Sequence, residues 1–287
     1  MKKRFENVTL VVISFKSNQN IKNLLSKIKD CINIILIENS TDLTLKDYYS
    51  KNNNIKFFFK KNIGFGPAIN EAAKFIKTKY FFVLNPDLSK MEEKTIFYFL
   101  KYAKKLNDNF GVLGPRYNNL ENDKSLKQSN KAKDIVNVNC ISGAAMFFNR
   151  NSFEEINGFD KNIFLYFEEN DICKRLNSIN KKVYQVNSIK INHNRGNSFD
   201  SNNVNEIEIM KMNSIWHFAW SKFYYLKKHY TYLIAILFVL PSIIRSFLKI
   251  CYYYSTKNKK DLKKYKFRFS GFVNSIMLKK SYRRPDL

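Results

Sequence analysis

Residues 80–87 read YFFVLNPD, an apolar run that ends abruptly in a polar turn. Aromatic and branched apolar side chains bounded by turn residues are typical of a buried β-strand. Comparable runs occur elsewhere in the first half of the chain, at residues 8–14, 32–38, 55–59 and 111–113. The sequence therefore predicts a strand at each of these positions.

The segments between these strands have the periodicity of helices. Apolar residues recur at spacings of three and four in residues 21–28, 68–76 and 96–103, which places them on one face of a helix. Strands and helices in alternation form the βαβ pattern, which gives a largely parallel sheet covered by helices. Ligands of such sheets bind beyond the carboxyl ends of the strands, so we expect chemistry in the residues that close each run.

Those closing residues are small, polar or acidic: Ser14-Phe15, Glu38-Asn39-Ser40, Asn62 to Gly66 and Asn85-Pro86-Asp87. Gly64 and Gly66 allow the backbone to approach a ligand closely. The helix that begins near Pro67 favours an anion such as a diphosphate at its N-terminus. A dinucleotide fingerprint would need a third glycine where Asn70 stands, which speaks against a nicotinamide or flavin site.

Asp87 is the one ionic residue in the turn that follows the strand at 80–84. A carboxylate in that position can ligate Mg²⁺ or Mn²⁺, hard ions that bind one or two carboxylates together with substrate phosphates. The alternative is a structural Asx turn or a cap of the helix predicted at 91–106. This residue alone does not decide between the two.

A second polar cluster lies at residues 168–171, Glu168-Glu169-Asn170-Asp171, directly after the large apolar residues 164–167. Carboxylates crowded together in an apolar setting raise one another's pKa, which is how a general base is tuned. The alternative is a negatively charged first turn that complements the dipole of the helix that follows. Both interpretations fit the residues.

The 287 residues have a formal net charge of +26, which raises nucleic acid as a partner. The charge is uneven, because residues 222–287 hold 16 basic and 2 acidic side chains. No recognisable nucleic-acid motif accompanies them, so no nucleic acid is expected as a partner; a Lys-rich compositional bias is the other explanation. Four cysteines without paired spacing predict neither a disulfide framework nor a zinc site and fit a reducing compartment.

Eight motifs follow one another in the chain: Val11 to Phe15, Glu38 to Ser40, Asn62 to Asn70, Leu84 to Asp87, Ser142 to Met146, Gly158 to Asp160, Phe164 to Asp171 and His193 to Ser198. In this order they resemble the family 2 glycosyltransferases of the GT-A fold, and within them the rhamnosyltransferase-like branch. The resemblance covers residues 7–200. It implies a Rossmann-like mixed sheet and an inverting, metal-dependent transfer of a sugar from a nucleotide-sugar.

The resemblance also implies roles for the residues at the strand ends. The nucleoside pocket would be lined by Ser14, Phe15, Glu38, Asn39 and Ser40, with Glu38 where the family usually has Asp. Asn62, Gly64 and Asn70 would face the diphosphate and the sugar. Asn85 and Asp87 match the family's metal motif, so that Asp87 would bind Mg²⁺ or Mn²⁺ and His193 would complete the metal shell.

In the carboxylate cluster, Glu169 stands at the position of the family's catalytic Asp. The resemblance implies that Glu169 deprotonates the acceptor hydroxyl, while the metal and a helix N-terminus stabilise the departing diphosphate. Glu168 is the alternative base. Asp160 and Asp171 are expected to shape the acceptor pocket or to cap the helix.

Beyond residue 200 the chain changes character, so we expect a catalytic domain at 1–204 and a basic, aromatic-rich helical region at 205–287. Residues 230–244 are nearly all apolar, but Pro241, Arg245 and Lys249 interrupt the run before the ~20 residues of a membrane span. Flanking lysines fit a helix that lies on an anionic membrane surface. The alternative is a subdomain that packs on the catalytic domain or forms a homodimer.

The sequence thus predicts a cytoplasmic glycosyltransferase, peripheral at the inner face of the cell membrane. It would move a sugar, with rhamnose as the leading donor, to a lipid-linked glycan acceptor that grows into a surface polysaccharide. The apolar run at the start of the chain is short and lacks a cleavage site, so a first strand is expected there rather than an export signal. The alternative class is a catalytically silent GT-A-like module for binding or assembly; Asp87 and the carboxylate cluster favour the enzyme.

Overall fold

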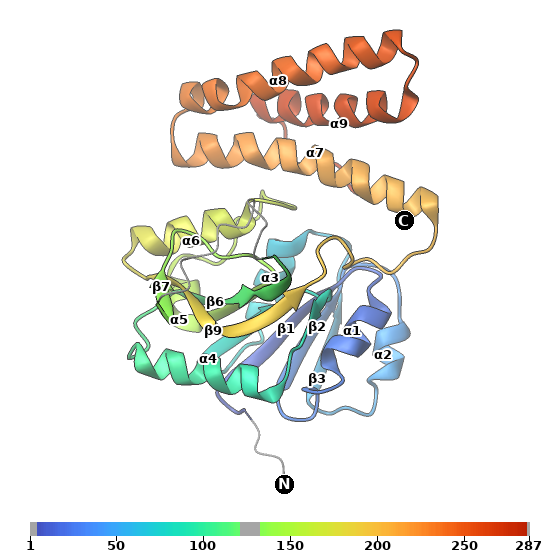
Figure 1. The fold of residues 1–287 in the computed structure, drawn as a ribbon. Helices are drawn as coiled ribbons and strands as arrows, with labels where there is room; N and C mark the ends of the chain where they lie inside the picture. Colours follow the sequence, from blue (N-terminus) through green and yellow to red (C-terminus); the bar gives the residue numbers. More distant parts are fainter. Residues whose placement is uncertain (1–4, 121–132, 286–287) are drawn as a thin grey trace. The chain divides into compact units, whose positions relative to one another are not determined.

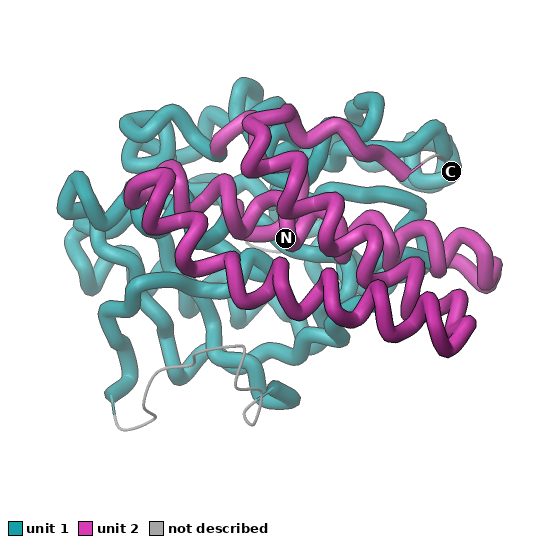
Figure 2. Tube along the Cα trace, turned by 90° about the horizontal axis from the view of Figure 1, so that it is seen from above, with its two compact units in different colours: residues 1–159, 169–200 teal, residues 160–168, 201–287 magenta. Residues whose placement is uncertain are grey.

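The computed structural model describes residues 5–120 and 133–285. The chain forms two compact units, which are coloured separately in Figure 2. Unit 1 consists of residues 1–159 and 169–200, and unit 2 consists of residues 160–168 and 201–287. A short segment from the middle of the chain therefore groups with the C-terminal residues.

Unit 1 is built on a mixed sheet (Figure 1). Its strands are β1 (Val8–Ser14), β2 (Asn33–Glu38), β3 (Ile55–Phe59), β4 (Tyr80–Leu84), β5 (Leu88–Ser89), β6 (Val112–Tyr117), β7 (Ile135–Asn137), β8 (Ala145–Asn149) and β9 (Val183–His193). They lie in the order β3-β2-β1-β4-β8-β6-β9-β5, and β7 pairs with β9. The pairs β1–β2, β1–β4, β2–β3 and β6–β9 are parallel, whereas β8 is antiparallel to both β4 and β6.

Helices cover the two faces of this sheet. They are α1 (Asn18–Leu25), α2 (Thr44–Tyr48), α3 (Phe65–Ala73), α4 (Glu93–Lys105), α5 (Arg150–Glu155) and α6 (Glu168–Ser178), with a 3₁₀ turn η1 (Asn118–Leu120). Residues of α1, α2 and α4 share one apolar core with Leu10, Val12 and Phe82. Residues of α3, α5 and α6 share the other with Val11 and Phe81. Successive residues of a strand thus enter opposite cores, as expected of a sheet buried on both faces.

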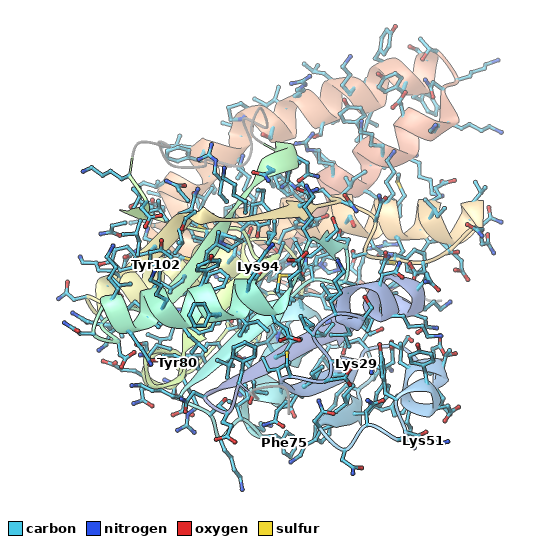
Figure 3. All side chains as sticks on the ribbon, turned by 60° about the horizontal axis from the view of Figure 1, so that its bottom comes forward. Lys29, Lys51, Phe75, Tyr80, Lys94 and Tyr102 are labelled. Atoms are coloured by element: carbon cyan, nitrogen blue, oxygen red, sulfur yellow. The ribbon has the colours of Figure 1, made fainter. Side chains whose placement is uncertain are left out.

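Helix α4 shows how one face of a helix meets the sheet while the other meets solvent (Figure 3). Tyr102 is only 8% exposed and joins the core that contains Phe82 and Phe99. Lys94 lies in the same helix with a side chain that is 72% exposed. Such burial of one face, at about 25 cal/mol per Å² of apolar area, is the main stabilising contribution to an amphipathic helix.

The predicted fold class is confirmed: an α/β sheet with parallel strands and a C-terminal helical region. The strand predicted at 111–113 runs farther, to Tyr117, because it shifts register at Pro115/Arg116 and continues along β9. A proline lacks the N–H that a sheet ladder needs, which accounts for an irregularity at this position.

Unit 2 contains three long helices, α7 (Val204–His229), α8 (Tyr232–Ser255) and α9 (Lys259–Ile276). Phe223, Ala235, Val239 and Phe272 form their shared apolar core. Pro241 was expected to interrupt the apolar run, but α8 continues through this residue and is 24 residues long in all. A proline inside a helix removes one backbone hydrogen bond, and Ala235 and Val239 of the same helix are fully buried in the shared core.

Candidate active site

The carboxyl ends of β1, β2 and β4 meet at one edge of the sheet. Ser14 is level with Glu38 in the pair β1–β2, and Val12 is level with Leu84 in the pair β1–β4. The chain leaves β1 toward β2 on one side and returns to β4 on the other. This is a topological switch point, the position where open α/β sheets bind ligands.

Several buried polar atoms at this edge have no hydrogen-bond partner among the described residues: Ser14 Oγ, Glu38 Oε2, Asn39 Oδ1 and Asn85 Oδ1. The other carboxylate oxygen of Glu38 accepts hydrogen bonds from the Ser40 N–H at 2.9 Å and the Ser40 hydroxyl at 2.6 Å. The Asn39 amide donates to the Gly64 carbonyl at 3.3 Å. An unsatisfied buried polar atom costs about 1–3 kcal/mol, so this set indicates the place of a polar ligand.

The residues that follow β1 hold the residues that follow β9. The rings of Phe15 and Phe199 stack with centroids 6.1 Å apart. The Asp200 carboxylate accepts from the Gln19 backbone N–H at 2.7 Å and from the Asn20 side chain at 2.6 Å. The Ser17 hydroxyl donates to the Ser198 carbonyl. Segment 198–200 is therefore fixed next to the predicted nucleoside pocket.

Asn62, Gly64 and Asn70 act on the backbone in this structure. The Asn62 side chain accepts from the Gly64 N–H at 3.2 Å. Gly64 precedes α3 with φ of 97°, a conformation that other residues rarely adopt. The Asn70 amide donates to the Phe159 carbonyl and accepts from the Phe159 N–H, both at 2.8 Å. Asn62 and Gly64 shape the start of α3, and Asn70 holds the Gly158-Phe159 turn.

Asp87 and His193 lie side by side because β5 pairs antiparallel with the end of β9. Asp87 Oδ1 is 3.3 Å from His193 Nε2. The two residues are buried, with 4% of Asp87 and 8% of His193 exposed. The Asn194 N–H donates to the Asp87 carbonyl at 3.0 Å. The Asn119 side chain donates to the His193 carbonyl at 2.9 Å and accepts from the His193 N–H at 3.0 Å. Hydrogen bonds to their backbone groups thus hold both residues in place.

This pair fits a divalent cation. Asp87 Oδ1 is buried without a hydrogen-bond partner among the described residues, and its separation from the imidazole is close to the ~3 Å between neighbouring ligands of an octahedral ion. Residues 5–120 and 133–285 contain no group of three His, Cys, Asp or Glu that could hold a metal. An ion held by Asp87 and His193 would keep open positions for water or phosphate oxygens, as is usual for Mg²⁺ and suits Mn²⁺.

Glu169 lies in the first turn of α6, close to the same edge. A Cβ placed on Gly143 would lie 3.6 Å from the Glu169 Cβ, and the neighbouring Ala144 carbonyl accepts from the Asn85 N–H at 2.8 Å. The loop at 142–144 thus connects the turn that bears Asp87 to Glu169. Burial raises the pKa of Glu169, and the nearby positive charge of Arg195 acts in the opposite direction.

The other two carboxylates of the cluster at 168–171, Asp171 and Glu168, are in different surroundings. Asp171 is fully buried and accepts from Arg175 Nε at 2.8 Å, with Nη2 at 2.7 Å. Glu168 is 8% exposed and belongs to unit 2. It follows Tyr166 and Phe167, which both have φ of 67°. Positive φ is rare for aromatic residues, and strained backbone of this kind clusters at functional sites.

Asp160 belongs to unit 2 as well, where it joins two elements. Its carboxylate lies 2.6 Å from Lys228 Nζ and accepts from the Tyr224 hydroxyl at 3.0 Å. Burial raises the pKa of Asp160, but the hydrogen bonds from Lys228 and Asn162 outweigh burial, so that the pKa lies below its usual range. Asp160 and Asp171 are thus both held by basic side chains. Their predicted roles toward an acceptor stay predictions.

Three residues near the site had no role assigned from the sequence. Asn119 holds the backbone of His193, and the buried Tyr117 has its ring 5.6 Å from the His193 ring. Arg195 lies within electrostatic range of Glu169 and of Tyr117. Arg195 could have been found from the sequence, because it is a cation two residues after the predicted metal ligand His193. Tyr117 and Asn119 lie in β6 and in the turn after it, which no sequence motif covered.

The fold and this arrangement define a GT-A glycosyltransferase. Residues 9–186 match the Glycosyl transferase family 2, and the chain belongs to this family. It is 22% identical over 213 residues to the low-salt glycan biosynthesis hexosyltransferase Agl10 of Haloferax volcanii, which covers 66% of this chain and 68% of the relative. It is 25% identical over 231 residues to the rhamnosyltransferase WbbL of Escherichia coli, covering 68% of this chain and 87% of that protein.

Solved structures of the same fold agree. The mannosyltransferase PcManGT from Pyrobaculum calidifontis, in complex with GDP-Man and Mn²⁺, superposes with a TM-score of 0.59 at 11% identity, covering 96% of this chain and 88% of the other. S. aureus TarS 1–349 in complex with UDP-GlcNAc superposes with a TM-score of 0.53 at 13% identity, covering 99% and 93%. At these identities the likeness establishes the fold alone.

Proposed function

We propose that this glycosyltransferase is an inverting, metal-dependent enzyme that transfers a sugar from a nucleoside-diphosphate sugar to a lipid-linked glycan. The observation that carries the proposal is the buried pair Asp87 and His193 at the switch point of the sheet, with Glu169 at the same edge. The GT-A structures crystallised with GDP-Man and Mn²⁺ or with UDP-GlcNAc support the class of donor.

Each side chain then has a task that follows from its surroundings. The unpaired atoms of Ser14, Glu38 and Asn39 bind the hydroxyl and N–H groups of the nucleoside. Asp87 and His193 would hold the cation, which when bound would supply positive charge toward the diphosphate oxygens. The Glu169 carboxylate accepts the proton of the acceptor hydroxyl. A raised pKa suits this task, because it makes the carboxylate a stronger base.

Inversion is proposed as a single displacement in which Glu169 is the base. A hydroxyl deprotonated by Glu169 attacks the anomeric carbon on the face opposite the diphosphate, and the bond to the diphosphate oxygen breaks as the new bond forms. One protein carboxylate and no covalent sugar–enzyme bond are needed for this single displacement. The positive charge of Arg195 lowers the pKa of Glu169 and so opposes the effect of burial.

Rhamnose is the proposed donor sugar, and similarity to a rhamnosyltransferase at 25% identity supports this choice. The test is a panel of nucleotide-sugars with different bases and sugars, scored for release of free nucleoside diphosphate with and without Mn²⁺. We expect release from one donor class, with a rhamnose donor preferred, and its loss on chelation. If no donor were consumed under any condition, the chain would be a silent GT-A-like binding module.

Unit 2 supports a membrane location for the acceptor. Among the described residues, α8 is the one helix long and apolar enough to cross a membrane, and 17% of its apolar window is buried. Its most exposed apolar side chains are Leu233, Leu237, Phe238, Leu248 and Tyr254, at 72, 68, 65, 61 and 73%. An apolar face of this extent on a soluble domain indicates a partner surface.

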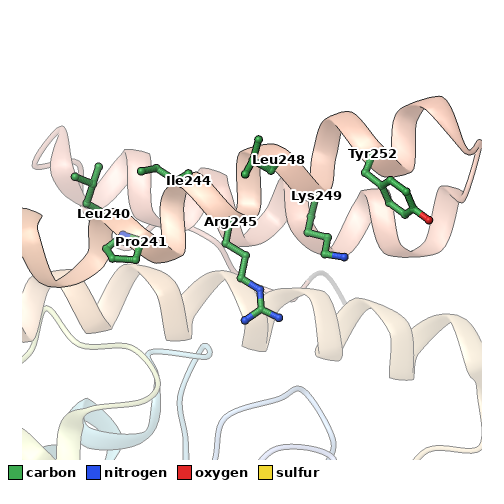
Figure 4. Close-up of a pocket in the computed structure, with 7 residues that line it drawn as sticks. All are labelled: Leu240, Pro241, Ile244, Arg245, Leu248, Lys249 and Tyr252. Atoms are coloured by element: carbon green, nitrogen blue, oxygen red, sulfur yellow. The ribbon is translucent and has the colours of Figure 1, made fainter.

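The charges beside this face favour a helix that lies on the membrane rather than across it. Arg245 and Lys249 project from the side of α8 opposite Leu240 and Leu248 (Figure 4), and with Ile244 these residues line one pocket. Long basic side chains of this kind reach lipid phosphates while their stems cover apolar surface. Helix α8 also packs on α9, whose first turns contain Lys259, Lys260 and Lys263. We therefore propose a peripheral enzyme on an anionic leaflet.

The side of the membrane is proposed from the cysteines. Cys31, Cys140, Cys173 and Cys251 are all free thiols, and Cys251 is exposed on α8. Free thiols persist in a reducing compartment. Together with the donor class, this supports the cytoplasmic face of the cell membrane.

A further inference from the structure

Unit 2 contains a cavity of about 220 Å³ that has no role in the transfer described above. It lies between α7, the end of α9, the segment that follows α9 and the loop at 161–164. Its aromatic wall consists of Phe164, Trp220 and Tyr224, and its basic residues are Lys161, Lys227, Lys279, Lys280 and Arg284. All of these residues belong to unit 2.

The described lining of the cavity is rich in positive charge. Within residues 5–120 and 133–285, no carboxylate lines the cavity and none of its five basic side chains forms an ion pair. The neighbouring carboxylate, Asp160, is already bound by Lys228 at 2.6 Å and by Tyr224 at 3.0 Å. A site with several cations and no acid attracts an anion.

A network of hydrogen bonds holds the segment that carries three of these cations. The Trp220 indole donates to the Lys279 carbonyl at 3.0 Å. His217 Nε2 lies 3.0 Å from the Arg283 carbonyl, which can only accept, so Nε2 carries the proton. His217 Nδ1 then accepts from the Ser281 hydroxyl at 3.1 Å. Burial lowers the pKa of His217 to about 3, which keeps the ring neutral at physiological pH.

Arg284 is placed by the same network. Its guanidinium lies 4.0 Å from the centroid of the Phe164 ring, and the Phe164 ring stacks on the His217 ring at 4.5 Å. One guanidinium nitrogen donates to the Ser281 carbonyl at 2.9 Å and to the Arg283 carbonyl at 2.6 Å. The planar group is thus oriented before any ligand arrives, and such preorganisation lowers the entropic cost of binding an anion.

The volume and the lining of the cavity limit which ligands it can bind. The 220 Å³ cavity is smaller than the roughly 300–1,000 Å³ of a site for a whole drug-sized molecule. It therefore holds a charged group of a larger ligand. Leu278 belongs to its lining and Met277 adjoins it, and these side chains are 61% and 60% exposed. An apolar chain attached to the charged group can lie along them.

We propose that this cavity binds the phosphate or diphosphate group of a lipid-linked acceptor. The proposal rests on the proposed function only for the molecule that carries the phosphate. Lys279, Lys280 and Arg284 bind the oxygens, and the aromatic wall faces the adjoining sugar or lipid. Arginine suits phosphate because its planar donors match two oxygens at once.

The test measures binding of the full-length chain, in the presence of a chelator, to neutral phosphatidylcholine vesicles that contain a small fraction of polyprenyl diphosphate. The double variant Lys279→Gln/Lys280→Gln should bind at least tenfold more weakly. The matched control Lys51→Gln/Lys56→Gln removes the same charge from exposed positions of unit 1 and should bind as wild type does. Arg284→Lys keeps the positive charge but loses the planar pair of donors that can bind two oxygens at once, so we expect intermediate binding. Circular dichroism melting curves verify that each variant is folded.

Three further arms separate the sources of the anion. Vesicles in which a fatty-acid carboxylate supplies the same charge should bind more weakly than diphosphate vesicles. Inorganic pyrophosphate should compete only at far higher concentration, because it lacks the apolar chain. Equal binding to carboxylate vesicles, competition by pyrophosphate at equal concentration, competition by an oligonucleotide, or an unaffected Lys279→Gln/Lys280→Gln variant would each overturn the proposal.

Failure of this proposal differs from failure of the proposed function. Release of nucleoside diphosphate by the wild-type chain tests the enzyme without any lipid. A chain that consumes a donor but binds diphosphate vesicles no better than neutral ones refutes the cavity alone. A chain that consumes no donor and still binds through Lys279 and Lys280 refutes the enzyme alone.

Discussion

The polar edge of unit 1 and the helices of unit 2 differ in which groups lack a partner. In unit 1, buried polar atoms of Ser14, Glu38 and Asp87 have no hydrogen-bond partner among the described residues. In unit 2, the buried hydroxyls of Ser221 and Ser275 donate to carbonyls at 2.8 and 2.9 Å, while large apolar side chains of α8 are exposed. Unpaired buried polar atoms indicate a polar ligand, whereas an exposed apolar face indicates a lipid or protein surface.

The largest effect is expected at Glu169. Glu169→Gln keeps the shape of the side chain but cannot accept a proton, so turnover on the acceptor should fall by about 10²–10⁴-fold, the usual contribution of a general base. Donor affinity should change little. Initial rates with donor and acceptor at saturation measure it, with Glu154→Gln on the exposed side of α5 as the control. If Glu168→Gln abolished transfer while Glu169→Gln stayed active, the base would be Glu168.

The next effect concerns the metal pair. Asp87→Ala should weaken Mn²⁺-dependent binding of nucleoside diphosphate by about 10²-fold or more, because loss of an outer-shell partner alone costs 10–100-fold. Mn²⁺ should support tighter binding than Mg²⁺, since an imidazole ligand suits the softer ion. Isothermal titration with and without chelator measures both, and Asp30→Ala, at an exposed position, is the control. Wild-type affinity that is the same with and without metal would refute the metal site.

A smaller effect is expected at the apolar face of α8. Each of Leu233→Gln, Leu237→Gln and Phe238→Gln should weaken binding to anionic vesicles by about tenfold or more, because burial of one such side chain contributes about 1.5–3 kcal/mol. High salt should weaken only the part that depends on lysines and arginines. Co-sedimentation measures this, with Ile207→Gln on α7 as the control. A chain that ignores vesicles and dimerises through α8 would contradict the membrane proposal.

The smallest effect is one on stability. Burial raises the pKa of Glu169 from the ordinary value of 4.5, so the folded chain binds this proton more tightly than the unfolded chain does. The protonated carboxyl therefore stabilises the folded chain at pH values below the pKa of Glu169 in the unfolded chain. This stabilisation is lost as the pH rises through the pKa of Glu169 in the folded chain. Glu169→Gln should therefore unfold at higher denaturant concentration than wild type at pH 7, with the difference vanishing near pH 4. Urea titrations at both pH values measure it; equal midpoints at pH 7 would contradict a raised pKa.

The strands and the polar residues at their ends could be predicted because both depend on short stretches of neighbouring residues. The runs at 8–14, 55–59 and 80–84 became β1, β3 and β4 with the same bounds. Asp87 and His193 were both predicted as metal ligands from a resemblance. Their 3.3 Å separation could not be read from the sequence, because it depends on pairing of the two-residue strand β5 with β9.

Other features depend on contacts that no local pattern encodes. Asp160 is bound by Lys228 and Tyr224 on α7, and nothing near Asp160 in the sequence indicates these partners. The membership of residues 160–168 in unit 2 has the same origin. Pro241 was expected to interrupt the apolar run, whereas α8 continues through it and its residues Ala235 and Val239 are buried in the core of unit 2. Contacts between distant parts of the chain, which a local pattern does not show, are involved in each of these features.

The pairing of β5 with β9 also has a consequence for the order of folding. Asp87 closes the fourth strand of unit 1 and His193 ends its last strand, so most of the unit must be in place before the two side chains meet. Contacts between distant parts of a chain form late, since closing a long loop loses entropy before the contact can stabilise it. The proposed metal site would therefore be among the last features of unit 1 to form, and metal binding through this pair would report a completed sheet.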